Sequence, residues 1–134
     1  MKILVVFGLI WVLFLVNYSL GDSLSPKPFW LDVAIHGWGG QLSALLCGFV
    51  LERFSLMFRV GSVLPRFVVM VACGLLLGAL LEAVEMFGML PIYAQDTSYW
   101  NLVQDLTVDF VGSIIGAFTY FAWNLREKGR NVCR

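Results

Sequence analysis

The stretch VVMVACGLLLGALLEAVE, residues 68–85, decides the fold because it joins a long apolar run to acidic residues at one end. No charged residue occurs from Phe67 to Leu81, and Glu82 and Glu85 follow directly. A helix needs about 20 apolar residues to cross roughly 30 Å of hydrocarbon. The stretch therefore predicts a membrane-spanning helix that carries carboxylates in its outer part.

The rest of the chain has the composition of a membrane protein. Of its 134 residues, 60% are hydrophobic and 13% are charged, and the mean hydropathy is +0.84. Soluble domains carry about 25% charged residues. We predict a single all-α integral membrane domain, residues 1–134, in which four transmembrane helices form a compact bundle at about 3–20, 31–51, 64–90 and 100–125. The zero net charge gives no indication of nucleic-acid binding.

The Lys and Arg residues gather on one side of this four-span arrangement. Lys27 alone falls on the outer side, and the others fall on the inner side: Lys2, Arg53, Arg59, Arg66, Arg126, Lys128, Arg130 and Arg134. Cytoplasmic loops carry the excess of Lys and Arg, so both termini are predicted to be cytoplasmic. We expect a protein of the plasma (inner) membrane of a bacterium.

The first apolar run also has features of a secretory signal peptide. Lys2 would form its positive region, and Ser19 and Gly21 would form a small-residue cleavage site. Cleavage would leave three spans without moving any candidate site residue. We favour the uncleaved helix.

Each of the other three predicted helices carries a polar pair at a spacing of three or four residues. The pairs are Asp32 and His36, Glu82 and Glu85, and Asp105 and Asp109. Residues at this spacing share a helix face, and the alternating direction of the helices puts all three pairs at a similar depth near the outer side. An acid near the centre of a bilayer costs about 2.5–3.5 kcal/mol. No Lys or Arg occurs at that depth, so a metal ion, a proton or a cationic ligand is the expected charge partner.

A mixture of histidine and carboxylates suits a divalent metal ion. We predict a metal site, with His36, Glu82 and Asp109 as its catalytic residues and His36 as either a ligand or a general base. The predicted ligands are Glu82, Glu85, Asp105, Asp109 and His36.

Four further polar residues are predicted to border this site. Asp32 and Asp96 are interpreted mainly as solvated residues of the outer surface. Gln41 and Gln104 either donate hydrogen bonds to the site or face lipid headgroups.

Two alternatives to the metal site remain open at this stage. The acids could share protons, because neighbouring like charges raise each other's pKa. They could also lie among solvated headgroups, if the third helix ended near Leu81 and the fourth helix began near Phe110.

Small residues and cysteines complete the pattern. Glycines four residues apart let membrane helices approach closely, so the third and fourth spans are predicted to contact each other, with the acids at the outer mouth of this contact. These glycines are Gly74, Gly78, Gly112 and Gly116. Cys47 and Cys73 lie in apolar runs and are interpreted as small buried hydrophobic residues, with no disulfide framework expected.

The C-terminal half resembles small bacterial membrane proteins of the VanZ-like and YjdF-like families. The resemblance is carried by short motifs over about 50 residues: Glu82-x-x-Glu85, a modified Asp96-Thr97-x-x-Trp100, and Asp105-Leu106-x-x-Asp109-x-x-Gly112-x-x-x-Gly116, with His36 upstream. The VanZ-like pattern has Gln at the position of Glu85, Asn at that of Asp109, and an Arg between the motifs, which this chain lacks. The resemblance implies a cell-envelope membrane protein with a carboxylate site. VanZ-like proteins are linked to resistance to glycolipopeptide antibiotics, and these departures argue against carrying that function over.

Three functions fit these features. The first is a metal-dependent enzyme that acts on a lipid or lipid-linked headgroup at the outer leaflet. The second is a non-catalytic assembly or binding subunit, in a homo-oligomer or with a membrane partner whose Lys or Arg the acids hold. The third is a proton- or cation-coupled carrier. The chain has no GxSxG, phosphate-loop, HExxH or CxxCH motif, which argues against enzymes built on them.

Overall fold

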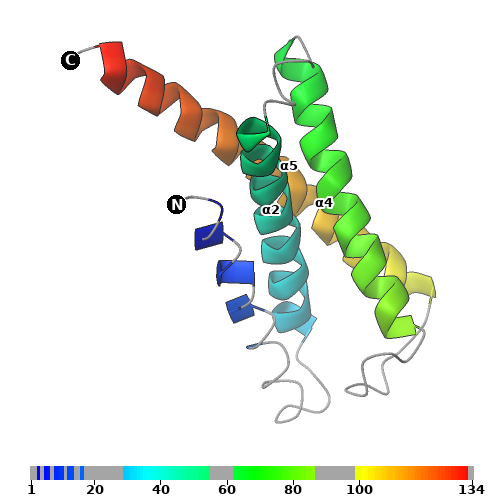
Figure 1. Cartoon of the computed structure of the whole chain (residues 1–134). Helices are drawn as coiled ribbons and strands as arrows, with labels where there is room; N and C mark the ends of the chain where they lie inside the picture. Colours follow the sequence, from blue (N-terminus) through cyan, green and yellow to red (C-terminus); the bar gives the residue numbers. More distant parts are fainter. Residues whose placement is uncertain are drawn as a thin grey trace.

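The structure, a computed structural model, describes residues 3, 5–6, 8–10, 12–13, 16, 29–54, 62–86 and 99–132. Three long helices account for most of this part: α2 (Phe29–Arg53), α4 (Val63–Met86) and α5 (Tyr99–Val132) (Figure 1). The described residues between 3 and 16 are also helical and lie beside α2. The prediction of an all-α fold is confirmed, since the described part of the chain contains no strand.

The helix ends differ from the predicted spans. α2 begins at Phe29 and ends at Arg53, two residues outside the predicted 31–51 at each end. α4 is described to Met86, so the predicted end at residue 90 lies outside the described residues. α5 continues to Val132, past the predicted 125. Hydropathy marks only the apolar part of a helix, whereas the Arg and Lys residues that follow are good helix formers in water.

Each of the three helices is long and apolar enough to cross a membrane. The apolar helical segments are Phe29–Arg53, Val63–Val84 and Trp100–Arg126, with 25, 22 and 27 residues. At a rise of 1.5 Å per residue they are about 33–40 Å long, more than the hydrocarbon core requires. Large apolar side chains on α4, such as Leu76 and Leu80, are exposed on the outside of the chain. These features indicate a membrane protein. Half of the first predicted span, 3–20, falls outside the described residues.

The apolar core lies toward the end of the helices at which α2 ends and α4 begins. Tyr120 of α5 is at its centre, with its ring edge-on to Phe49 of α2 at a centroid distance of 5.3 Å. The Tyr120 hydroxyl donates a hydrogen bond to Glu52 at 3.3 Å. The buried members of the core are Val6, Leu45, Phe49, Met70, Val71, Ala117 and Tyr120.

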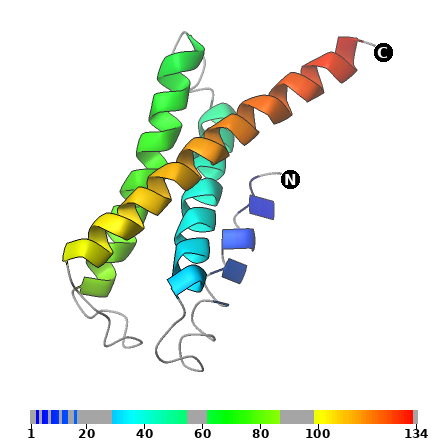
Figure 2. The same ribbon diagram turned by 180° about the vertical axis from the view of Figure 1, so that it is seen from behind.

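α5 crosses α2 at very short range, as seen from behind in Figure 2. A Cβ atom at Gly112 would collide with the backbone carbonyl of Gly37, and one at Gly116 would collide with that of Gln41. In the reverse direction, a Cβ atom at Gly40 would collide with the backbone carbonyl of Asp109. Only residues without a side chain allow the two backbones to approach this closely.

α5 also contacts α4 through glycines, as predicted. A Cβ atom at Gly74 would overlap the Ser113 hydroxyl, and one at Gly78 would overlap the Asp109 carboxylate. The prediction that Gly112 and Gly116 also belong to this contact is wrong, because both residues face α2. Successive residues of a helix point about 100° apart around its axis. Residues on one broad face of α5 can therefore contact either of two neighbouring helices.

Adjacent glycines of α2 provide a test of this packing. Gly40→Ala should lower the free energy of unfolding by about 1–3 kcal/mol, because the new methyl group would push α5 away. Gly39→Ala should leave it unchanged or raise it slightly, because no atom lies within 4 Å of its Cβ position and Ala favours helix. Unfolding of both variants in detergent should be compared. Equal effects would contradict the described crossing.

Candidate functional site

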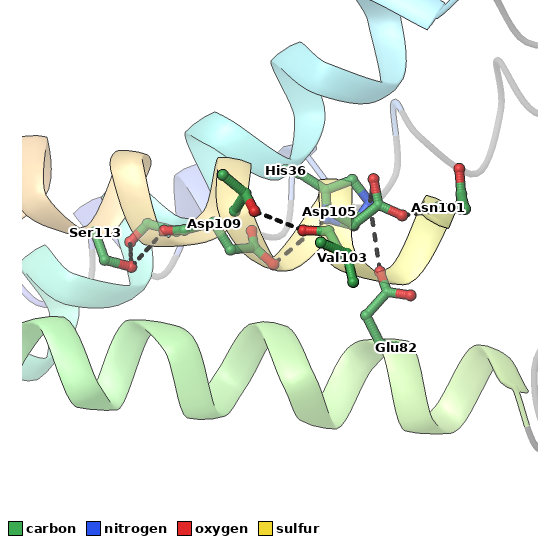
Figure 3. Close-up of polar contacts among 9 residues, drawn as sticks. His36, Glu82, Asn101, Val103, Asp105, Asp109 and Ser113 are labelled. Carbon is green, nitrogen blue, oxygen red and sulfur yellow. Dashed lines mark hydrogen bonds and ion pairs between the residues drawn. The ribbon is translucent and has the colours of Figure 1, made fainter. Parts of the chain in front are cut away.

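Four polar side chains from three helices meet near the end at which α2 begins, α4 ends and α5 begins (Figures 1 and 3). His36 comes from α2, Glu82 from α4, and Asp105 and Asp109 from α5. By helical rise, His36 is about 10 Å from the start of α2 and Glu82 about 6 Å from the end of α4. The three acids are 7%, 2% and 3% exposed, respectively. We refer to these four residues as the His36 cluster.

The imidazole of His36 lies between carboxylates on both of its nitrogen sides. Nδ1 is 3.5 Å from Oδ2 of Asp109. Nε2 is 3.6 Å from Oε1 of Glu82 and 3.9 Å from Oδ1 of Asp105. Both of these facing oxygens are buried, and Figure 3 shows Glu82 reaching from α4 toward the ring. The two nitrogens therefore have different acidic neighbours.

The Nε2 distances are longer than ordinary hydrogen bonds, which join N and O at about 2.7–3.2 Å. Two ligands of one ion at about 2.0–2.2 Å, with angles of 90–110°, are themselves about 2.8–3.6 Å apart. The spacing of 3.6 Å lies at the upper end of this range, and the spacing of 3.9 Å lies just above it. A small inward movement of side chains would bring Nε2 and both oxygens to an ion.

Asp32 extends the cluster along α2. It lies one turn before His36 and is half-buried. Asp32, His36 and Asp105 each offer one ligand atom within 4.8 Å of the other two. Asp32 therefore belongs to the candidate site itself, whereas the sequence placed it mainly on the solvated surface around the site.

Two neutral polar residues that the sequence analysis did not select support the acids. Asn101 donates a hydrogen bond from Nδ2 to Oδ2 of Asp105 at 2.9 Å. The buried Ser113 hydroxyl is 2.7 Å from the carbonyl oxygen of Asp109 and 3.3 Å from that of Gly40. Each lies four residues from an acid of α5, so it shares a helix face with that acid. This spacing could have identified both residues from the sequence.

The remaining predicted residues are not placed in the cluster. Glu85 is on α4, but its side chain lies outside the described part, and Asp96 lies outside the described residues altogether. Gln41 contributes backbone to the crossing of α2 and α5, and Gln104 is half-buried on α5. No contact described for either amide side chain reaches the cluster.

The alternative in which the third helix ends near Leu81 and the fourth begins near Phe110 is wrong. α4 continues through Glu82 to Met86, and α5 begins at Tyr99, well before Phe110. The described acids of these two helices lie inside the helix contact and are nearly fully buried.

The cluster concentrates negative charge far from the basic end of the helices. With ionised carboxylates and a neutral imidazole, Asp32, Glu82, Asp105 and Asp109 bring four negative charges together. Arg53, Arg66 and Arg126 lie at the opposite end of their helices. Like charges in apolar surroundings are strongly unfavourable, so a bound cation or bound protons would stabilise the site.

Fold and site together define a class: an all-helical membrane protein with a histidine–carboxylate cluster at one end of its helices. Comparison with known proteins does not narrow this class. No protein family, no curated protein and no solved structure matches the chain. Function is therefore inferred from the residues of the site.

Replacing Asn101 tests how far the acids depend on their neutral neighbours. Asn101→Ala should lower the free energy of unfolding by about 1–3 kcal/mol, because the buried Asp105 carboxylate would lose its 2.9 Å donor. Thr107→Ala is the control, since its exposed hydroxyl donates only to Val103 of its own helix. The two unfolding curves in detergent give the difference. A loss as large in the Thr107 variant would contradict a specific role for Asn101.

Proposed function

We propose that the chain is a four-span protein of the bacterial plasma (inner) membrane, with both termini in the cytoplasm, that binds a divalent metal ion near the outer leaflet. We further propose that the bound metal acts on a lipid or lipid-linked headgroup. The observation that carries this proposal is the convergence of Asp32, His36 and Asp105, whose ligand atoms lie within 4.8 Å of one another. Buried carboxylates with an imidazole among them are a donor set for a divalent ion.

The two sides of the imidazole suggest two roles for the acids. In this proposal Nε2 of His36 binds the metal together with Asp105 and Glu82, whose oxygens face it, and Asp32 completes the set. Asp109 accepts a hydrogen bond from Nδ1–H and fixes the ring orientation. Histidine ligands commonly have such a carboxylate on their other nitrogen. Asp109 is then a positioning residue, which refines its predicted role as a ligand.

The donor types narrow the choice of metal. One imidazole nitrogen with carboxylate oxygens suits zinc, manganese or iron. Calcium prefers an all-oxygen set of six to eight ligands and fits less well. Manganese and zinc are the ions to test first.

The place of the cluster supports chemistry at a headgroup. Trp30 and Trp100, near the starts of α2 and α5, are 68% and 77% exposed, and such aromatic residues anchor helix ends at the membrane surface. A headgroup at that surface could approach the ligands from the helix ends. A metal ion held there would polarise a phosphoryl oxygen or lower the pKa of a bound water.

Metal content is the direct test of the proposed site. Purified wild-type protein, loaded with manganese or zinc and then desalted, should retain the ion in near-stoichiometric amount. Glu82→Gln and Asp105→Asn should lose most of it. Asp109→Asn should bind about 10–100-fold more weakly, because it loses only the support of a ligand. Elemental analysis and metal titration give these values.

Glu52→Gln is the matched control, because this acid lies on α2 at the opposite end of the helices. It should bind as much metal as wild type. A wild-type protein that retains neither ion would overturn the metal proposal and favour bound protons or a partner's Lys or Arg.

Turnover tests the second part of the proposal. Liposomes that contain the manganese- or zinc-loaded protein and polyprenyl-pyrophosphate lipids should release phosphate, and a chelator should stop the release. Even when loaded with metal, Asp109→Asn should release phosphate up to about 100-fold more slowly, because a misoriented imidazole changes the arrangement of ligands around the ion. Release at the wild-type rate by the loaded Asp109 variant would exclude the assigned role of this residue.

A further inference from the structure

Two free thiols occupy facing positions on α2 and α4, away from the His36 cluster. Cys47 belongs to α2 and Cys73 to α4, and both are half-buried. The two thiols are close enough to interact across the contact between α2 and α4. From the sequence each cysteine is a separate small apolar residue, so their contact is a property of the folded chain.

The backbones of α2 and α4 come close at Gly74, and a side chain of α4 fills the space beside Gly48. A Cβ atom at Gly74, the neighbour of Cys73, would lie 3.3 Å from the carbonyl oxygen of Gly40. A Cβ atom at Gly48, the neighbour of Cys47, would lie 2.7 Å from the terminal methyl group of Met70. A disulfide requires Cα atoms about 4.4–6.8 Å apart, and two helices in contact through glycines can approach each other this closely.

We propose that Cys47 and Cys73 form a redox site, at which a membrane quinone oxidises the two thiols to a disulfide that joins α2 to α4. The two thiols give up two protons and two electrons, and one S–S bond forms. The quinone takes up both protons and both electrons and becomes a quinol. No other co-reactant is needed.

The position of the pair explains why the oxidant is lipid-soluble. By helical rise, Cys47 is about 9 Å from the end of α2, and Cys73 is about 15 Å from the start of α4, measured from the same side of the helices. This depth is within the hydrocarbon region, which charged oxidants do not enter. The half-buried thiols leave part of each side chain open to small apolar molecules.

The disulfide would fix the two helices that supply His36 and Glu82. Oxidation would therefore link α2 covalently to α4, farther along the helices than the His36 cluster, whatever ligand that cluster holds. This inference does not depend on the proposed metal or on catalysis.

Thiol counting in the full-length chain tests the proposal. Cys133→Ser leaves Cys47 and Cys73 as the only thiols. In liposomes this variant should be treated with a fully substituted benzoquinone that carries an alkyl tail, because such a ring does not add to thiols. After denaturation, a maleimide reagent should label neither cysteine in a monomeric chain, and dithiothreitol should restore both labels.

The double variants Cys133→Ser with Cys47→Ser or Cys73→Ser are the controls, and each should keep its single thiol through the same treatment. The oxidised chain should also unfold at a higher temperature than the reduced one, because a cross-link restricts the unfolded state. Retention of both labels, a disulfide between two chains, or loss of the thiol in a single-thiol variant would each overturn the proposal. An unchanged or lower unfolding temperature of the oxidised chain would contradict the claim that the disulfide fixes α2 to α4.

Discussion

The close crossing of α5 with both α2 and α4 is the contact on which the fold and the site depend. In lipid, apolar surfaces gain little from being buried against each other, so helices associate through tight packing and polar contacts. Gly40, Gly112 and Gly116 provide that packing between α5 and α2, and Gly74 and Gly78 provide it between α5 and α4. The Asp109 carboxylate fits against Gly78 because that position has no side chain.

This packing has an electrostatic consequence. Asp105 and Asp109 turn inward because the α5 face that packs against its neighbours also carries them. There they meet His36 and Glu82 from the two other helices. The same bundle holds a second polar contact at its other end, between Tyr120 and Glu52, with the apolar core nearby. Polar contacts thus join the helices at both ends, and within the described residues the acids gather in the His36 cluster.

The four residues of the His36 cluster were predictable because acids stand out in apolar runs and helical rise places them at similar depth. Asn101 and Ser113 were not, since a neutral polar residue on a membrane helix can face lipid, water or a neighbour at modest cost. Their roles depend on the rotation of α5, which sequence spacing does not set. The same rotation sends Gly112 and Gly116 toward α2. The contact between Cys47 and Cys73 could not be predicted either, because two isolated cysteines carry no spacing signal.

The sequence by itself determined that this is an all-helical chain with membrane-length apolar segments and an acidic group with one histidine near one end of them. Hydropathy, charge and periodicity are properties of single helices, and each can be counted along the chain. Only the tertiary structure decided which nitrogen of His36 faces Asp109 and which faces Glu82 and Asp105, and it brought Asp32 into the site. These contacts depend on the crossing and rotation of helices, which side chains from three separate segments set together.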